Sequence, residues 1–257
     1  MRSLSLPVLQ TGYRKMNFYG EETYGERVAG VFDDWYGDYD PDTINVLAEL
    51  AGRGRALELG IGTGRVALPL LARNVEVHGV DSSPAMVDKL RAKPQGDRVP
   101  VSLGNFADVS IDGEFALVYV VFNTIFALSS QDEQVRCFRN VAKHLAPRGC
   151  FVIEAFVPDV KRFNGGQVNR ATKVTADRVE LDVGQHDSAE QRVNSQHVVI
   201  TDGKINLFPV QIRYAYPSEL DLMAQLAGLR FRERWSDWQR NPFNSDSKKH
   251  ISIYERS

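Results

Sequence analysis

The 257-residue chain predicts an α/β fold, a doubly wound parallel sheet with an antiparallel β ribbon inserted near its end. Three observations carry this prediction. Short apolar runs alternate with amphipathic segments over residues 56–156, a glycine-rich turn follows the first run, and strict alternation replaces this pattern after residue 156. The first pattern is typical of strand-helix-strand units, and the last is typical of antiparallel strands.

Five apolar runs predict the parallel strands, because each run is short and is bounded by turn residues. The runs are 56–59, 75–80, 99–103, 115–122 and 150–156. The clearest helix lies between the fourth and fifth runs, where Ser130 and Glu133 match a capping box and Pro147 ends the apolar periodicity. Another helix is expected from Ser83, a cap residue that a proline follows.

The segment from about 170 to 216 predicts an antiparallel ribbon of three or four strands. Asp202-Gly203 is a type I′ hairpin signal. Alternate residues over 208–216 share one face of a long strand, and Pro209 within it favours an edge or bulge position.

A helix from Ser218 and two closing strands, at about 230–236 and 249–256, are expected to complete a main sheet of seven strands. We expect four regions along the chain: an N-terminal helical and aromatic lid segment, the core, the inserted ribbon and the closing elements. Their expected bounds are 1–50, 51–160, 161–216 and 217–257.

The composition excludes several classes of partner. Hydrophobic residues make up 43% and charged residues 25%, as in ordinary globular domains, and the formal charge is −2 without a long basic run. We therefore expect no nucleic-acid partner, because a phosphate backbone demands a basic surface. The chain has no stretch of 18 apolar residues and no signal-peptide pattern, so we expect no membrane partner and a cytoplasmic location.

The cysteines and histidines predict no metal site. Cys137 and Cys150 do not form a CxxC pair, so reduced core thiols are favoured over a disulfide or a metal site. The five histidines lack HxxH or HxH spacing. We expect no metal cofactor.

A glycine-rich turn follows the first strand, with Gly60, Gly62 and Gly64 spaced as G-x-G-x-G. Glycines at a strand-to-helix turn accept positive φ angles and let a ligand approach the backbone. A purely structural loop uses the same residue, so the turn alone leaves both interpretations open. Arg65 occupies the position of the third glycine in a dinucleotide fingerprint, which disfavours NAD and favours a cofactor without a pyrophosphate.

Asp81 follows the second predicted strand at its carboxyl end. A carboxylate at this point can accept hydrogen bonds from both ribose hydroxyls of an adenosine. The alternative is that Asp81 helps to cap the helix that begins at Ser83. Together with the glycine turn, its position favours ribose binding.

These segments resemble the successive cofactor motifs of class I S-adenosylmethionine-dependent methyltransferases, over about residues 32–156 and again in the last strands. The residues that carry the resemblance are Glu58, Gly60, Gly62, Gly64, Asp81 and Gly104-Asn105-Phe106. The resemblance implies a Rossmann-like seven-stranded sheet, S-adenosylmethionine as the cofactor, and methyl transfer as the reaction. The cofactor contacts that it implies are Glu58, Gly60, Gly62, Gly64, Asp81, Ser82, Met86, Asn105, Phe106 and Phe122.

The resemblance assigns the adenine contacts to the segment after the third strand. It implies that the Asn105 side chain meets the adenine amino group and that the Phe106 backbone meets a ring nitrogen. Many relatives have aspartate at the position of Asn105. Met86 would pack on the adenine, or would belong to the ordinary core.

Residues 24–36 are similar in layout to the N-terminal segment of small-molecule N-methyltransferases, including those acting on nucleotide-linked amino sugars and, more distantly, glycine. This narrower resemblance implies a segment that closes over the cofactor, with Tyr36 facing the methyl group and Trp35 forming a pocket wall. Without the resemblance, an aromatic docking patch formed by Trp35, Tyr36 and Tyr39 is an equally favoured interpretation. The chain departs from the amino-sugar enzymes at Ala127, where they carry a histidine, and alanine cannot act as a base.

The expected acceptor is a small molecule, and N-methylation of a secondary metabolite or amino compound is favoured over O- or C-methylation. Methyl transfer from a sulfonium is an in-line displacement that depends mainly on positioning. Candidates for orienting or deprotonating the acceptor are Tyr36, Asn123 and Glu154. A salt bridge with a nearby arginine is the alternative role of Glu154. Candidate acceptor-binding residues are Trp35, Phe126 and Tyr214.

The inserted ribbon fits either an acceptor lid or a dimer surface, and the resemblance favours a homodimer because relatives with such inserts often pair through them. Two rival functions come from other classes. A nicotinamide-dependent oxidoreductase would need G-x-G-x-x-G and usually Tyr-x-x-x-Lys, and the chain has neither. A non-catalytic S-adenosylmethionine-binding protein is disfavoured by the aromatic segment with Tyr36.

Overall fold

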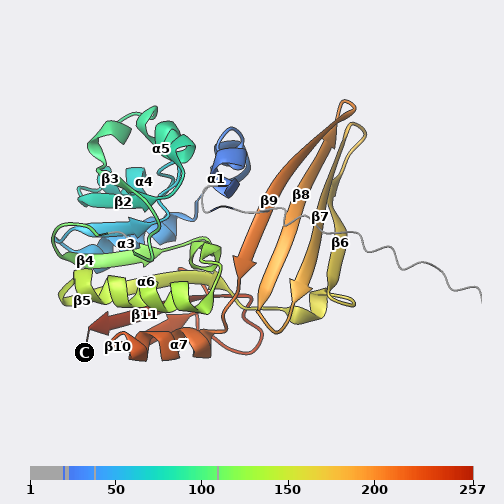
Figure 1. The fold of residues 1–257 in the computed structure, drawn as a ribbon. Helices are drawn as coiled ribbons and strands as arrows, with labels where there is room; N and C mark the ends of the chain where they lie inside the picture. The colour runs from blue at the N-terminus through green and yellow to red at the C-terminus, as the bar shows by residue number, and fades with distance from the viewer. Residues whose placement is uncertain (1–19, 21–22, 38, 109, 257) are drawn as a thin grey trace, which may run out of the picture.

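The structure is a computed structural model that describes residues 20, 23–37, 39–108 and 110–256. Figure 1 shows two sheets: a seven-stranded sheet among helices, and a four-stranded antiparallel sheet that stands beside it. This arrangement confirms the predicted fold class. Residues 1–19 of the expected lid segment lie outside the described residues.

The seven-stranded sheet has the order β10-β11-β5-β4-β1-β2-β3. Neighbouring strands from β5 to β3 are parallel, whereas β11 runs antiparallel to both β5 and β10. The strands are β1 (Ala56–Leu59), β2 (Val77–Asp81), β3 (Val101–Leu103), β4 (Phe115–Val120), β5 (Leu145–Phe156), β10 (Leu229–Trp235) and β11 (Lys249–Arg256). All five apolar runs and both expected closing strands are therefore present.

The fifth strand begins earlier than its apolar run predicts. Leu145 already pairs with Phe115 of β4, and the register then shifts so that Cys150 pairs with Leu117. Arg148 takes a positive φ of 66° inside this irregular stretch. Regular pairing thus resumes only where the apolar run starts.

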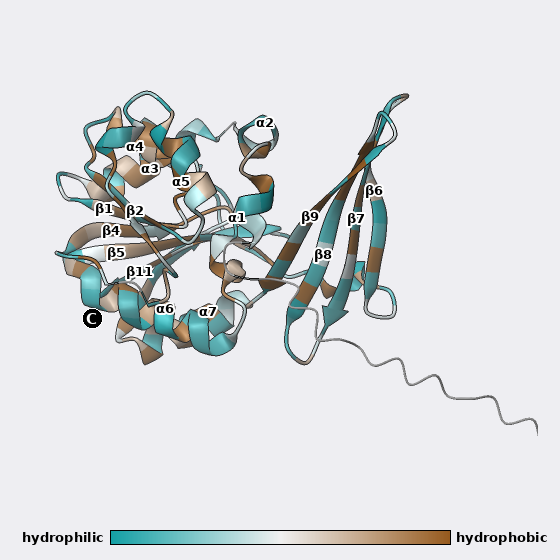
Figure 2. Ribbon diagram, turned by 45° about the horizontal axis from the view of Figure 1, so that its top comes forward, coloured by the Kyte–Doolittle hydropathy of each residue, from teal (hydrophilic) through white to brown (hydrophobic). Residues whose placement is uncertain are grey.

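Helices cover both faces of the main sheet, as Figure 2 shows, with α3, α4 and α5 on one side and α6 and α7 on the other. The helices are α1 (Thr23–Val28), α2 (Phe32–Tyr36), α3 (Pro41–Ala51), α4 (Ala67–Leu71), α5 (Pro84–Arg91), α6 (Gln131–His144) and α7 (Pro217–Leu226), with short 3₁₀ turns at η1 (Gly96–Arg98), η2 (Thr124–Ala127) and η3 (Val160–Arg162). Two apolar clusters form the core, one under each layer. In the described part of the chain, none of the helices combines the length and the apolar character that a membrane crossing requires.

The predicted helix starts are confirmed by their hydrogen bonds. The backbone N–H of Glu133 donates to Ser130 Oγ at 3.2 Å, and Glu133 Oε2 accepts from the Ser130 N–H at 3.0 Å. Ser83 Oγ likewise accepts from the N–H of Met86 at 3.3 Å. Each cap satisfies donors that the first helical turn leaves unpaired.

The insertion forms a four-stranded antiparallel sheet in the order β6-β7-β8-β9. Its strands are β6 (Gln167–Val174), β7 (Arg178–Asp187), β8 (Arg192–Thr201) and β9 (Lys204–Arg213). Asp202 and Gly203 have φ angles of 49° and 71°, as a type I′ turn requires. Pro209 lies in β9, an edge strand, so its missing N–H leaves no gap inside the sheet.

Candidate active site

A cavity of about 700 Å³ lies between the two sheets. Its walls come from the turns after β1, β2, β4 and β5, from α1 and α2, and from the inner face of the β6–β9 sheet. The carboxyl ends of parallel strands meet at this edge, where open α/β sheets bind their ligands. A volume of this size holds two small molecules side by side.

The glycine turn forms the floor of the cavity. Gly60 and Gly62 have φ angles of 73° and 55°, which L-residues with a side chain rarely adopt. A Cβ at Gly60 would also collide with the side chain of Thr124. Gly60 therefore lets the turn pack closely against Thr124, and Gly60 and Gly62 both line the cavity.

Asp81 lies at the end of β2 and lines the cavity beside Ser82. Its Oδ2 accepts from the Gly62 N–H at 2.7 Å and its Oδ1 from the Ser83 N–H at 2.9 Å. Burial raises the pKa of Asp81, and these backbone hydrogen bonds oppose the shift. The geometry therefore shows the carboxylate fixing the turn and the helix start, and ribose binding by Asp81 stays a prediction.

Glu58 is 3% exposed and also lines the cavity. Burial raises its pKa to about 8, although the Tyr119 hydroxyl, which donates to Glu58 Oε2 at 2.9 Å, favours the ionised form. Nearby, the Arg65 guanidinium lies 4.5 Å above the centre of the Phe122 ring. The turn is thus bordered by one titratable acid and one cation.

Most of the predicted cofactor contacts lie together at this end of the cavity. The lining residues among them are Glu58, Gly60, Gly62, Asp81, Ser82, Met86, Phe106 and Phe122. Gly64 and Asn105 are not among the lining residues. A Cβ at Gly64 would meet Leu90 of α5, so this glycine serves helix packing.

The side chain of Asn105 does not reach into the cavity as the resemblance implies. Its Oδ1 accepts from the Ala107 N–H at 2.9 Å, and its Nδ2 donates to Glu133 Oε1 at 3.4 Å. These contacts hold the loop after β3, and the neighbouring Phe106 lines the cavity instead. Asn105 thus shapes the loop through local hydrogen bonds.

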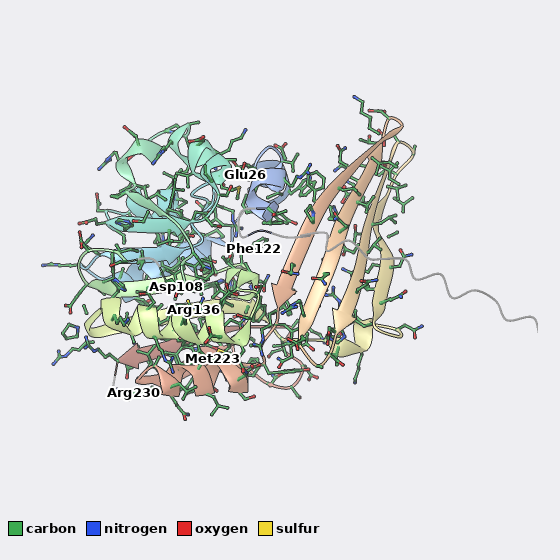
Figure 3. The ribbon with its side chains drawn as sticks, in the orientation of Figure 1. Glu26, Asp108, Phe122, Arg136, Met223 and Arg230 are labelled. Carbon is green, nitrogen blue, oxygen red and sulfur yellow. The ribbon has the colours of Figure 1, made fainter. Side chains whose placement is uncertain are left out.

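The N-terminal helices close the cavity from the side, and two acidic residues attach them. Glu26 of α1 accepts from Ser83 Oγ at 2.9 Å and from the Ala85 N–H at 3.1 Å, at the start of α5. Asp33 of α2 accepts from Thr63 Oγ1 at 2.6 Å. Figure 3 shows Glu26 and Phe122 on the side of the core that faces the β6–β9 sheet.

Sequence reasoning missed Glu26 and Asp33. The sequence separations of their bonds, 57 residues for Glu26 to Ser83 and 30 for Asp33 to Thr63, leave no local pattern. The sequence shows only an acidic residue in each of two short helices. Such a residue does not identify the group with which it forms a hydrogen bond.

Tyr36 and Trp35 point to different surroundings. Tyr36 lines the cavity with its ring 5.0 Å from that of Phe122, and burial raises the pKa of its hydroxyl. Trp35 is not among the lining residues, and its ring packs against His197 at 5.2 Å and Phe208 at 4.6 Å. We therefore correct the predicted role of Trp35 as a wall of the pocket: its ring packs α2 against the inserted sheet.

The other two predicted catalytic residues shape the turn after β4. Glu154 does not line the cavity: its Oε2 accepts from the Phe122 N–H at 3.1 Å, and its Oε1 accepts from Trp238 Nε1 and Lys249 Nζ, both at 3.1 Å. Glu154 does form a salt bridge, but with Lys249 rather than with the expected arginine. Asn123 lines the cavity, but its Oδ1 already accepts from the Phe156 N–H at 2.7 Å.

The two remaining acceptor candidates are both buried, but only one of them lines the cavity. Phe126 packs behind the lining residue Phe156 at 4.9 Å, so we correct its expected acceptor contact to a core role. Tyr214 lines the cavity, and its hydroxyl lies 3.0 Å from His186 Nε2.

Comparisons with known proteins agree with this geometry. A family model described as "Methyltransferase domain" matches residues 56–149. The CcbJ methyltransferase from Streptomyces caelestis has 42% sequence identity and a TM-score of 0.87, over 93% of this chain and 100% of that one. The cypemycin N-terminal methyltransferase from Streptomyces sp is 28% identical over 201 residues, or 78% of this chain and 82% of that protein.

A more distant structure shares the fold over the full length. It is SAM-bound CalS10, an amino pentose methyltransferase from Micromonospora echinaspora, with 20% identity, a TM-score of 0.59 and complete coverage of both chains.

Proposed function

Because this chain belongs to the class I S-adenosylmethionine-dependent methyltransferases, we propose that it methylates an amine nitrogen on a small-molecule acceptor. Enclosure is the observation that supports the small-molecule part: the α1–α2 segment and the inserted sheet both contribute to the walls of the cavity. The choice of nitrogen is supported by relatives whose names state N-methylation or amino-sugar methylation.

The cavity residues fit S-adenosylmethionine. The open backbone at Gly60 and Gly62 leaves room for an elongated ligand, and Asp81 offers carboxylate oxygens for ribose hydroxyls. Met86 is 5% exposed and lies over Gly62, where it can pack against an aromatic base. When bound, the cofactor supplies a methyl group on a positively charged sulfur.

The protein's own contribution is positioning and exclusion of water. Tyr36 and Phe122 present aromatic rings in contact with each other at the end of the glycine turn, and such faces attract cations. Glu26 and Asp33 hold the segment that carries Tyr36 against this turn. An acceptor confined here would approach the methyl group in a restricted orientation, which is the main requirement of a displacement at carbon.

A labelling experiment tests this proposal. The protein is incubated with methyl-labelled S-adenosylmethionine and a panel of primary and secondary amines, amino sugars and phenols. We expect label in amines. Label found only in phenols, or only on carbon, would replace the proposed N-methylation by O- or C-methylation. Methyl transfer itself would be overturned if calorimetry showed binding of NAD but not of S-adenosylmethionine.

We also propose that the protein forms a homodimer through the outer face of the β6–β9 sheet. On that face Val174, Ile205 and Leu207 are 69%, 66% and 53% exposed. The cross-strand register aligns Val174, Val179, Ile200 and Ile205. The strand dimensions give a face of about 600 Å², near the roughly 800 Å² per partner of a standard interface.

Light scattering during size-exclusion chromatography tests the dimer. We expect twice the chain mass for the unaltered protein and the mass of one chain for Leu207→Lys, which places a charge on the apolar face. Leu222→Lys, on the exposed side of α7, is the matched control and should remain dimeric. A single-chain mass for the unaltered protein would remove the proposal.

A cytoplasmic location is a further proposal, supported by the cysteines. Cys137 and Cys150 are free and buried, which suits a reducing compartment. Fractionation of the source cells, with detection of the protein, tests this location.

A further inference from the structure

The face of the inserted sheet that lines the cavity carries a carboxylate and an imidazole. Asp182 of β7 and His197 of β8 are direct cross-strand partners, and both line the cavity. His197 Nδ1 lies 3.1 Å from Asp182 Oδ1. The carboxylate therefore takes Nδ1, while Nε2 lies 3.6 Å from Glu180 Oε2, beyond hydrogen-bond distance.

Other charged groups surround this pair. Glu180 Oε2 lies 3.6 Å from His197 Nε2, and Glu180 is itself paired with Arg178 at 2.7 Å. Asp182 is paired with Arg170 at 3.2 Å, whose side chain is 62% exposed. Each acid thus has an arginine partner besides His197, and Asp182 and His197 both line the cavity.

Aromatic packing fixes the imidazole and links it to the glycine-turn end of the cavity. The Trp35 ring meets His197 edge-on at 5.2 Å, and Phe208 is the cross-strand partner of His197 on the other side. Trp35 contacts Tyr36 at 6.1 Å, and Tyr36 contacts Phe122 at 5.0 Å. Burial and then the charges of Asp182 and Glu180 raise the pKa of Tyr36.

An amine acceptor needs a base because a protonated nitrogen has no lone pair with which to attack. Ala127 lines the cavity without a titratable group. Tyr36 and Tyr214 have raised pKa values and are poor bases near neutral pH. Among the described residues that line the cavity, His197 is the single imidazole.

We infer that His197, oriented by Asp182, accepts the proton that a cationic amine acceptor loses before methyl transfer. This inference rests on the proposed N-methylation and names its substrate class: an amine that arrives as an ammonium ion.

The proposed step balances without a further reactant. The ammonium N–H bond breaks, and its proton passes to His197 Nε2. The freed nitrogen lone pair then forms the bond to the methyl carbon while the carbon–sulfur bond breaks, and that electron pair stays on sulfur. His197 acts as a catalytic residue, and Asp182 acts as a positioning residue.

The first test compares pH profiles, with the amine that accepts label in the panel above as substrate. For His197→Gln we expect kcat/KM to be lower by about 100-fold at neutral pH, and the deficit to shrink as the pH approaches the amine's own pKa, where solvent deprotonates it. Asp182→Asn should show a smaller deficit of the same shape. His144→Gln, at the end of α6, is the control and should match the unaltered protein.

The shape of the profile separates the inference from the proposed function. A deficit in His197→Gln that is equal at every pH, or no deficit, overturns the inference while amine methylation stands. Failure of the unaltered protein to methylate any amine overturns the proposed function instead. Calorimetry with S-adenosylmethionine, which should bind equally to all variants, shows that they fold.

A second test uses binding alone and the unaltered protein. Histidine-labelled protein is titrated with benzylammonium chloride, with benzyl alcohol as the neutral probe of matched shape. We expect the His197 imidazole resonance, identified by its loss in His197→Gln, to shift with benzylammonium only. An unmoved resonance, or equal shifts with both probes, contradicts recognition of a cationic amine at this pair.

Discussion

Glu58 shows how burial changes the chemistry of a single side chain in the cavity. Glu58 lies on β1, is 3% exposed and accepts a hydrogen bond from the Tyr119 hydroxyl. Burial raises the pKa of its carboxyl to about 8. Its folded pKa lies above the ordinary value, so at pH 7 the group carries its proton in the folded protein. A cation that binds beside it would favour the ionised form.

We therefore predict proton release when S-adenosylmethionine, which carries positive charge, binds at pH 7. Up to about 0.9 proton should leave, the fraction bound for a pKa one unit above the pH. Calorimetry in buffers of different ionisation enthalpy measures this number. Glu58→Gln should bind without release, and a buffer-independent binding enthalpy in the unaltered protein would contradict the prediction.

At the scale of an element, the turn between β4 and η2 is held in an unfavourable conformation. Phe122 and Asn123 have successive positive φ angles of 57° and 66°. Such residues persist only where their surroundings over-determine them. Glu154 supplies that restraint, because its side chain accepts from the Phe122 N–H and its backbone carbonyl accepts from the Asn123 N–H at 3.1 Å.

Glu154→Ala should therefore misplace the Phe122 ring without emptying the cavity. We expect kcat/KM to fall by about 10- to 100-fold, because small displacements near the reacting groups cost this much. Affinity for S-adenosylmethionine should change by less than about threefold, since the glycine turn and Asp81 are intact. Steady-state kinetics and calorimetry measure the two quantities, with Glu49→Ala, an exposed acid on α3, as control. Equal losses in both would refute a positioning role.

At the scale of the whole molecule, one buried ion pair joins the inserted sheet to the core. Arg213 at the end of β9 is 5% exposed and pairs with Glu219 of α7 at 2.6 Å. Its second branch donates to Gln134 of α6 at 2.6 Å, and Gln134 returns a bond to the Arg213 carbonyl at 2.7 Å. The end of β9, the following helix α7 and the distant helix α6 thus meet at this side chain.

Arg213→Ala should lower the free energy of unfolding by about 3–5 kcal/mol, because it leaves Glu219 and Gln134 buried without their partner. Chemical denaturation followed by circular dichroism measures the change. Arg230→Ala removes an exposed pair with Glu255 (Figure 3) and should cost about 1 kcal/mol or less. Similar losses of unfolding free energy in both variants would show that Arg213 does not stabilise the contact between the inserted sheet and the core.

The stability of the molecule should also depend on pH through His250. Burial lowers the pKa of this fully buried imidazole to about 3, so the folded protein holds it neutral. As the pH falls below the ordinary value of 6.5, the unfolded chain takes up the proton first, and stability is lost progressively toward pH 3.

Urea denaturation at pH 7 and pH 5 checks this expectation. The unaltered protein should lose more stability on acidification than His250→Gln does. Glu58, whose pKa is raised, acts in the opposite direction: its contribution falls as the pH rises from about 4.5 to about 8. The difference between the two proteins isolates His250, and an identical pH dependence in both would count against the prediction.

Local patterns in the sequence account for most of the fold. The apolar runs, the capping box at Ser130 and the turn at Asp202 each act within a few residues, and each is present in the structure. The glycine turn and Asp81 were also predicted, because a strand end and the residue after it share one edge of a parallel sheet.

Tertiary structure alone decided which side chains line the cavity beyond the glycine turn. Trp35 of α2 packs against the inserted sheet, Glu154 supports a turn, and His197 faces the cavity beside Asp182 because of the β7–β8 register. Register and long-range docking depend on contacts between residues far apart in sequence, and no local periodicity encodes those contacts. The sequence by itself therefore determined the sheet and the glycine turn with Asp81 at its edge, and the packing of two sheets and a short N-terminal segment decided which other side chains line the cavity.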